Sequence, residues 1–214
     1  MVPFSVESWI GLVGHYNQSY WPSNFAVVPL VGALLWFAGQ PSRSRRSMVA
    51  WLLCFCWLWC GVVFHQEYFS TLTWVAEYYG WLFILQAVLL VLWTIFRPRT
   101  VNPAVAMTAS VSIAMMVFAL LGLPLLQLSA GHHLSQLGWF ALTPDSTALM
   151  TIGLLGYSGA LRYSLVVIPV IWGIIVFANS WPLEYMPGMT ILPVIIAALL
   201  WSVVCNKRQQ IRDI

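Results

Sequence analysis

Long apolar stretches alternate with short polar stretches along the whole of this 214-residue chain. A helix needs about 20 apolar residues to cross the hydrocarbon core of a bilayer, and several of the stretches approach or reach this length. The pattern therefore predicts an all-α bundle of membrane-spanning helices, formed by a single domain that covers residues 1–214. The seven predicted spans are residues 21–39, 48–66, 74–96, 103–127, 146–161, 163–180 and 189–205.

The fifth predicted span, residues 146–161, is the shortest. As a helix it covers about 24 Å, which is less than the ~30 Å of a typical hydrocarbon core. If this stretch enters and leaves the membrane on the same side, the protein has six spans instead of seven. Gly153, Gly156 and Gly159 form a stripe of small residues along it, which predicts close packing against a neighbouring helix.

The distribution of charge favours seven spans and predicts their orientation. With seven spans, every Lys and Arg lies on one side, while all four His and every acid except Asp213 lie on the other. Short cytoplasmic loops are rich in Lys and Arg, so we expect the N-terminus outside and the C-terminus in the cytoplasm. The basic residues are Arg43, Arg45, Arg46, Arg97, Arg99, Arg162, Lys207, Arg208 and Arg212, and those opposite are Glu7, His15, His65, Glu67, Glu77, His132, His133, Asp145 and Glu184.

Residues 5–20 are too polar to span. Their apolar side chains recur at helical spacing, which predicts a short amphipathic helix on the outer membrane interface. These side chains are Val6, Trp9, Ile10, Val13 and Tyr16.

The composition indicates that lipid, and not water, surrounds most of the protein. Hydrophobic residues make up 61% of the chain and charged residues 7%, with a mean hydropathy of +0.84, whereas a soluble domain carries about 25% charged residues. The net charge of +3 predicts no nucleic-acid partner, because orientation accounts for basic residues in short loops. The sequence leaves open whether the protein forms a homo-oligomer or joins a larger membrane complex.

A histidine and two glutamates lie at the outer ends of the second and third predicted spans. His65 closes the second span, Glu67 follows it, and Glu77 lies one turn into the third. The connection between these spans is short, so we expect the helix ends to be neighbours. An ionisable residue within a span is costly unless it is paired, and it therefore indicates function. Two interpretations stay open, since His65 and Glu77 form either a cation site or a structural ion pair.

Two adjacent histidines, His132 and His133, lie in a predicted outer loop. Together with His65 and Glu77 they predict a divalent metal site for Zn or Cu, because imidazole and carboxylate groups bind these metals. The alternative is that both are solvated loop histidines, since structural metal ligands usually come at fixed separations.

We also predict a polar vestibule on the outer side. Asp145 belongs to it, although Thr143-Pro144-Asp145 is also a favourable helix start, with Thr at the N-cap and an acid in the first turn. The predicted lining residues are Tyr16, Asn17, His65, Glu67, Glu77 and Asp145.

Five short motifs occur in order along nearly the whole chain. They are Pro3-Phe4-Ser5, Tyr16-Asn17, Trp21-Pro22, Phe64-His65 and Phe140-Ala141-Leu142-Thr143-Pro144-Asp145-Ser146-Thr147. In this order and spacing they resemble a family of small bacterial membrane proteins with several spans, catalogued only as a domain of unknown function. The resemblance implies a compact helical protein of the bacterial inner membrane. It supplies no activity, but it draws attention to Tyr16, Asn17 and His65.

Phe64-His65 and Glu77 are also similar to the ceramidase-like metal hydrolases, which carry a His at the end of the second span and an acid soon after it. Those enzymes need a His-x3-His pair in the last span, and residues 189–205 contain no histidine. A zinc site without that pair lacks its ligands, so we do not take the likeness as evidence of the activity.

The sequence thus predicts a membrane protein for the permeation or handling of a small polar solute or cation, with a vestibule that opens to the outside. Two alternatives stay open. One is a membrane-embedded metal-dependent hydrolase that acts at the outer leaflet, with a metal-activated water near His65. The other is an accessory subunit of a larger membrane complex. The sequence leaves it uncertain whether the protein is an enzyme, and we lean towards a non-enzymatic role.

Overall fold

The computed structural model describes residues 4–39, 42–96, 108–157 and 163–212, and within these ranges the chain is helical and has no β-strand. The predicted all-α fold is confirmed. The α-helices are α1 Val6–Ser19, α2 Ser23–Ala38, α3 Arg43–Trp59, α4 Ala76–Phe96, α5 Ala109–Val117, α6 Leu123–Ser129, α7 Pro144–Tyr157, α8 Tyr163–Ser180, α9 Met186–Met189 and α10 Ile191–Arg212. Two π-helices, η1 Cys60–Tyr68 and η3 Phe118–Gly122, and two 3-10 helices, η2 Phe69–Thr71 and η4 Leu134–Gln136, complete the described chain.

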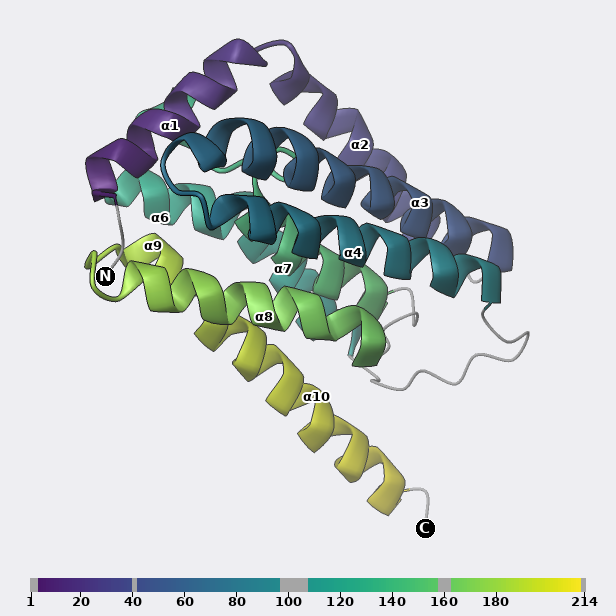
Figure 1. The fold of residues 1–214 in the computed structure, drawn as a ribbon. Coiled ribbons are helices and arrows are strands. Elements are labelled where there is room, and N and C mark those ends of the chain that lie inside the picture. The colour runs from purple at the N-terminus through teal and green to yellow at the C-terminus, as the bar shows by residue number, and fades with distance from the viewer. Residues whose placement is uncertain (1–3, 40–41, 97–107, 158–162, 213–214) are drawn as a thin grey trace.

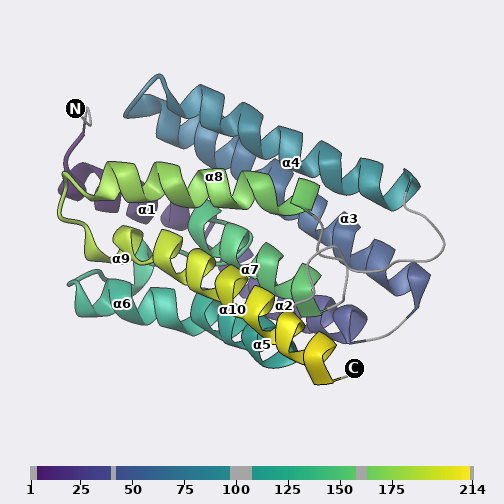
Figure 2. The ribbon, with the colours of Figure 1, turned by 90° about the horizontal axis from the view of Figure 1, so that it is seen from below.

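Helix α7 lies in the centre of the bundle, where α2, α3, α5, α8 and α10 surround it (Figure 1, Figure 2). All but one of its 14 residues are buried. A helix that is apolar on nearly every side is stable only where protein or lipid covers all of its faces. The stretch predicted as the fifth span therefore contains the helix around which α2, α3, α5, α8 and α10 pack.

Within the residues that the structure describes, four helices are long and apolar enough to cross a membrane, which indicates a membrane protein. They are Ser47–Thr71, Ala76–Phe96, Ala109–Ser129 and Met186–Val204. Two further apolar helices, Phe25–Ala38 and Ser164–Ser180, are shorter. Seven spans and their orientation stay predictions.

The outer surfaces of these helices carry large apolar side chains. Phe25 on α2 is 65% exposed, Trp81 on α4 is 63% exposed and Leu200 on α10 is 62% exposed. Side chains of this kind are favourable against acyl chains and unfavourable in water. The exposed apolar surface therefore fits a lipid environment.

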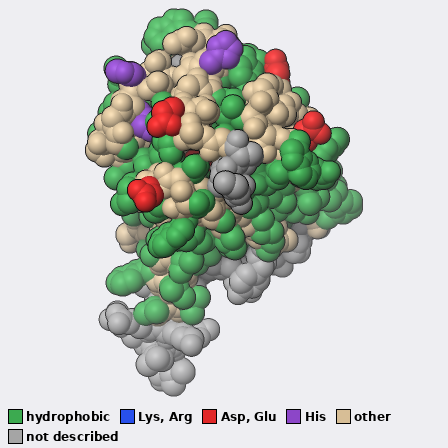
Figure 3. Space-filling view, turned by 60° about the vertical axis from the view of Figure 1, so that its left-hand side comes forward, with side chains coloured by type: hydrophobic (Ala, Val, Ile, Leu, Met, Phe, Trp, Pro, Cys, Tyr) green, Lys and Arg blue, Asp and Glu red, His purple; other side chains and the backbone are tan. Residues whose placement is uncertain are grey.

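Charged positions separate between the two ends of the bundle. Arg43, Arg45 and Arg46 open α3 at the end where α10 closes with Lys207, Arg208 and Arg212 (Figure 1). Figure 3 faces the opposite end, and acidic and histidine side chains gather in the upper part of that view. Arg97, Arg99, Arg162 and Asp213 lie outside the described residues.

Two glycines permit a close contact between η1 and α4. A Cβ atom on Gly80 would lie 2.8 Å from the carbonyl oxygen of Gly61, and a Cβ atom on Gly61 would lie 3.0 Å from that of Gly80. Gly153 of the predicted small-residue stripe has a similar position on α7, because its Cβ would lie 3.0 Å from the carbonyl oxygen of Ser112 on α5. Small residues at these points let the helix backbones approach closely.

We expect Gly80→Ala to destabilise the protein, because the added methyl group meets a backbone oxygen that cannot move alone. Overpacking of this kind costs about 1–3 kcal/mol, and the thermal midpoint in detergent is expected to fall by several degrees. Gly32→Ala on α2 is the control, since no atom lies within 4 Å of its Cβ. An equal effect of both substitutions would contradict the close contact.

Candidate functional site

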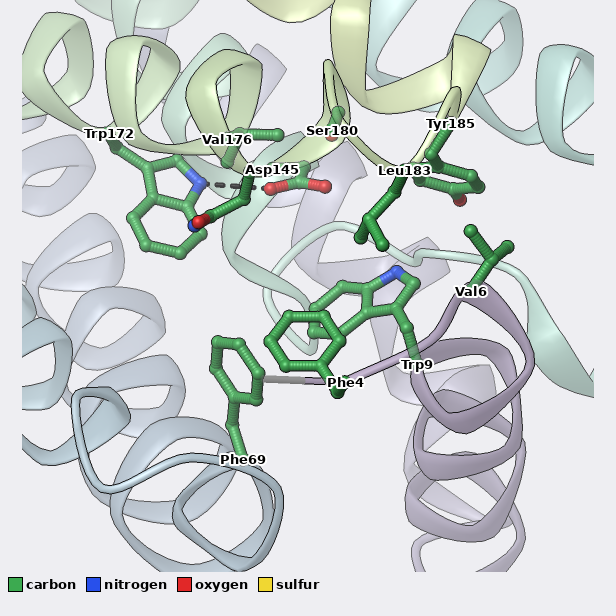
Figure 4. A pocket seen from close by; sticks show the side chains of 11 residues that line it. Phe4, Val6, Trp9, Phe69, Asp145, Trp172, Val176, Ser180, Leu183 and Tyr185 are labelled. Carbon is green, nitrogen blue, oxygen red and sulfur yellow. Dashed lines mark hydrogen bonds between the residues drawn. The ribbon is translucent and has the colours of Figure 1, made fainter. Parts of the chain in front are cut away.

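A cavity of about 40 Å³ lies between α1, the start of α7 and the end of α8 (Figure 4). A cavity of this size holds about three water molecules. Its polar groups come from Asp145, Asn179, Ser180 and Tyr185, whereas most of its wall is aromatic or aliphatic. The remaining lining residues are Phe4, Val6, Trp9, Phe69, Trp172, Val176 and Leu183.

Asp145 is the acidic group of this cavity. Its side chain is only 7% exposed, and its Oδ1 accepts a hydrogen bond of 2.9 Å from Nε1 of Trp172 on α8. Within the described part of the chain, that bond is the one hydrogen bond of the Asp145 side chain. Asp145 therefore does not cap the amides of α7, and helix capping alone does not explain its position.

The cavity extends from the end of the bundle, where Ser180 and Leu183 line it, inwards to Asp145 and Trp172. Trp172 lies eight residues before Ser180, the last residue of α8, which corresponds to about 12 Å along the helix axis. Helix α7 begins at this depth, because the preceding loop enters the bundle before the helix starts. The cavity thus brings a carboxylate into the interior of the bundle.

The environment of Asp145 disfavours its charge. Asp145 precedes the predicted span 146–161, and burial raises the pKa of its carboxyl from the ordinary 3.8 to about 6, while the hydrogen bond from Trp172 opposes this rise. The burial of Tyr185, together with the nearby charge of Asp145, raises the pKa of the Tyr185 hydroxyl. A buried carboxylate without a cationic partner is costly, and a bound positive charge would remove much of that cost.

Three aromatic rings form the wall opposite Asp145. The ring centroids of Phe4 and Phe69 lie 5.6 Å apart, and those of Trp9 and Phe69 lie 5.0 Å apart. Figure 4 shows Phe4, Trp9 and Phe69 on one side of the space and the carboxylate of Asp145 with Trp172 on the other. The cavity therefore combines one carboxylate with several aromatic faces.

His65 lies behind this wall, on the π-helix η1. Neither of its ring nitrogens has a hydrogen-bond partner, and the residue is completely buried. Its ring centroid lies 5.0 Å from Trp172 and 4.6 Å from Phe83. π-helical turns inside longer helices frequently occur at functional sites. Trp172 thus contacts His65 through its ring and Asp145 through its N–H, and the sequence analysis had named these two residues separately.

Tyr16 and Asn17 hold the loop that precedes α7. The hydroxyl of Tyr16 donates to the carbonyl oxygen of Leu142 at 2.9 Å, and Nδ2 of Asn17 donates to the carbonyl oxygens of Ser135 and Leu137 at 2.9 and 2.8 Å. Tyr16 is completely buried, and Asn17 borders a separate, wider groove beside α2. Both predicted vestibule residues lie away from the lining of the Asp145 cavity.

The other predicted site residues are dispersed. Glu67, Glu77 and His133 are exposed, whereas His132 is buried with its ring centroid 5.7 Å from that of Tyr185. Glu77 does not hydrogen-bond to His65, because both His65 nitrogens lack a partner. In the ranges that the structure describes, no three His, Cys, Asp or Glu side chains could together hold a metal ion.

Sequence reasoning missed the aromatic part of the site. Trp172 lies in an otherwise apolar predicted span, where a tryptophan resembles any lipid-facing or core residue. Trp9 belongs to the predicted amphipathic face of residues 5–20, but it packs on Phe64 and Phe69. The one sequence signal for this part of the site was the motif Pro3-Phe4-Ser5, because Phe4 lines the cavity.

The helical fold and its apolar outer surface indicate a helical membrane protein. A family model described as a family of unknown function (DUF6064) matches residues 6–212, so the chain belongs to this family. The searches of curated proteins and of solved structures found no match.

We expect Asp145→Asn to remove a pH dependence of stability. Because the folded protein holds the Asp145 proton more tightly than the unfolded chain, this carboxyl lowers stability as the pH rises from about 4 to about 6. Above this window the variant is therefore expected to be more stable than the parent by about 1–3 kcal/mol, and below it the two should be similar.

Thermal midpoints measured in detergent between pH 4 and pH 7 provide the test. Glu184→Gln is the matched control, since Glu184 is an exposed carboxyl in the turn between α8 and α9. Parallel pH profiles for the parent and Asp145→Asn would show that the burial of Asp145 does not affect stability in this way.

Proposed function

We propose that this protein is an integral protein of a bacterial inner membrane that binds a small cationic solute at Asp145, as a step in the permeation or handling of that solute. In this proposal the end of the bundle with the acidic and histidine residues faces outwards, and the C-terminus lies in the cytoplasm. The positive-inside rule supports this orientation, because the basic positions at the start of α3 and the end of α10 lie at the opposite end.

One observation carries the proposal: Asp145 is a buried carboxylate that borders a cavity, and its hydrogen-bond partner is the neutral N–H of Trp172. Ionisable residues inside membrane proteins are costly, and they commonly mark ligand or ion pathways. A cation in the cavity would offset the charge of this carboxylate within a largely apolar lining.

The placement of α7 supports solute handling over a purely structural role. In many membrane transporters, helices that begin or end inside the bundle form the binding site near the middle of the membrane. Here α7 starts at the depth of Trp172, and its start borders the cavity. The loop that enters the bundle thus leads directly to the carboxylate.

The metal-hydrolase alternative has less support. His65 is enclosed by aromatic rings, and the described residues provide no group of three metal-binding side chains. A catalytic zinc site normally has three protein ligands and an open position. The donors that surround the cavity suit a single positive charge better than a metal with several ligands.

The proposal predicts saturable binding of at least one small cation. Purified protein in a non-ionic detergent is titrated with Na⁺, K⁺, ammonium, methylammonium and tetramethylammonium, and the rise in thermal midpoint is followed as a function of concentration. Asp145→Asn is expected to weaken the binding by at least about tenfold, since a charge-assisted contact is lost. Glu184→Gln, an exposed carboxyl, is expected to leave it unchanged.

Two outcomes would overturn the proposed function. One is the absence of a saturable shift with every cation in the series. The other is equal affinity in the parent and in Asp145→Asn, provided that the variant is folded.

The orientation makes a separate prediction. A green fluorescent protein fused after Ile214 is expected to fluoresce in cells, whereas alkaline phosphatase fused at the same position is expected to be inactive. Both results follow from a cytoplasmic C-terminus. The opposite pair of results would place the basic end of the bundle outside and reverse the proposed direction of access.

A further inference from the structure

From the composition of the cavity wall, we infer that the bound cation is an organic ammonium ion that carries alkyl groups on its nitrogen. This inference rests on the proposed function and specifies its ligand class. The cavity combines the carboxylate of Asp145 with the faces or edges of Phe4, Trp9, Phe69, Trp172 and Tyr185.

Aromatic rings are good partners for an alkylammonium ion. The negative face of a ring attracts a cation within about 6 Å, most strongly when water is excluded, and cages of several rings recognise quaternary ammonium groups. Phe4, Trp9 and Phe69 are packed together by ring contacts of 5.0 to 6.3 Å, so this wall is in place before a ligand arrives. Trp172 faces it across the cavity and is oriented by its bond to Asp145.

The same wall is unfavourable for divalent inorganic cations. Ca²⁺ and Mg²⁺ need about six or more oxygen ligands, and Mg²⁺ keeps several of its waters. The cavity offers side-chain oxygens from Asp145, Asn179, Ser180 and Tyr185, and its other lining side chains present carbon or indole nitrogen. An alkylated ammonium head has apolar surface for those carbons and one positive charge for the carboxylate.

The volume agrees with a ligand of this kind. A space of about 40 Å³, enough for about three waters, accommodates a compact ammonium head and little more. The rest of a larger molecule would extend towards the end of the bundle, where Val6 and Leu183 border the cavity. A free amine and the ammonium headgroup of a lipid share this chemistry, and the experiment separates them.

The experiment compares choline with 3,3-dimethyl-1-butanol, which has the same shape but a carbon atom in place of the charged nitrogen. Protein in dodecyl maltoside, which contains no ammonium group, is titrated with each compound by calorimetry. We expect choline to bind at least about tenfold more tightly than the neutral analogue, and more tightly than Na⁺ or K⁺.

Substitutions in the aromatic wall test its contribution. Trp9→Leu is expected to weaken choline binding by about 3- to 30-fold and Trp9→Phe by less, because a ring face remains. Trp181→Leu is the matched control. Trp181 directly follows the end of α8, is 64% exposed and does not line the cavity. Phe69→Leu supplies a second variant should Trp9→Leu not fold.

The source of the ligand is tested in lipid nanodiscs. Phosphatidylcholine carries the same ammonium group as choline, whereas phosphatidylglycerol carries none. If a lipid headgroup occupies the cavity, phosphatidylcholine is therefore expected to compete with choline, so that choline binds in phosphatidylglycerol discs and not in phosphatidylcholine discs. If the ligand is a free amine, the affinity is expected to be the same in both.

The outcomes separate the two proposals. If Na⁺ or K⁺ binds in a way that depends on Asp145 and choline does not bind, the inference of an organic ammonium ligand is wrong, while the proposed function stands. Equal binding of choline and its neutral analogue, or equal effects of Trp9→Leu and Trp181→Leu, would also overturn it. No binding of any cation would overturn both.

Discussion

Every backbone amide and carbonyl that enters an apolar bundle needs a hydrogen-bond partner from the protein itself. This constraint is most severe in the loop before α7, which runs among buried side chains without forming a helix. Gln127 Oε1 accepts from the amide of Gly138, Thr147 Oγ1 accepts from that of Ala141, and Tyr16 donates to the carbonyl of Leu142. Polar side chains from α1, α6 and α7 itself thus allow α7 to start inside the bundle, and the position of Asp145 follows from that start.

Much of the architecture was readable in the sequence, because it depends on local patterns. Apolar stretches of helical length predicted the all-α fold, and charge placement predicted which helix ends lie together. The position of α7 was not readable. Hydropathy treats residues 146–161 as one more span, whereas the structure surrounds α7 with protein. Which apolar helix lies at the centre depends on its contacts with neighbours, and periodicity within one segment carries no information about them.

The residues of the candidate site were likewise predictable from the sequence one by one, but not as a group in contact. Asp145 and His65 stood out as ionisable residues in apolar surroundings, but the sequence paired His65 with Glu77 on the basis of neighbouring helix ends. In the structure Glu77 is exposed, and the residue that contacts both His65 and Asp145 is Trp172, far along the chain. A tryptophan on a span usually indicates lipid or core packing, so its role as the link between two buried polar groups becomes visible only in three dimensions.

The π-helix η1 takes up extra chain within the helix that begins as α3. A π-helical turn closes with an i→i+5 hydrogen bond, so it holds about one more residue than an α-helical turn. Removing a single residue from η1 would therefore let such a turn close as an α-helix, while the helix on either side keeps the direction in which its side chains face. In this family, an alignment gap of one position within η1 would mark the loss of a π-helical turn and not a rotation of the flanking residues.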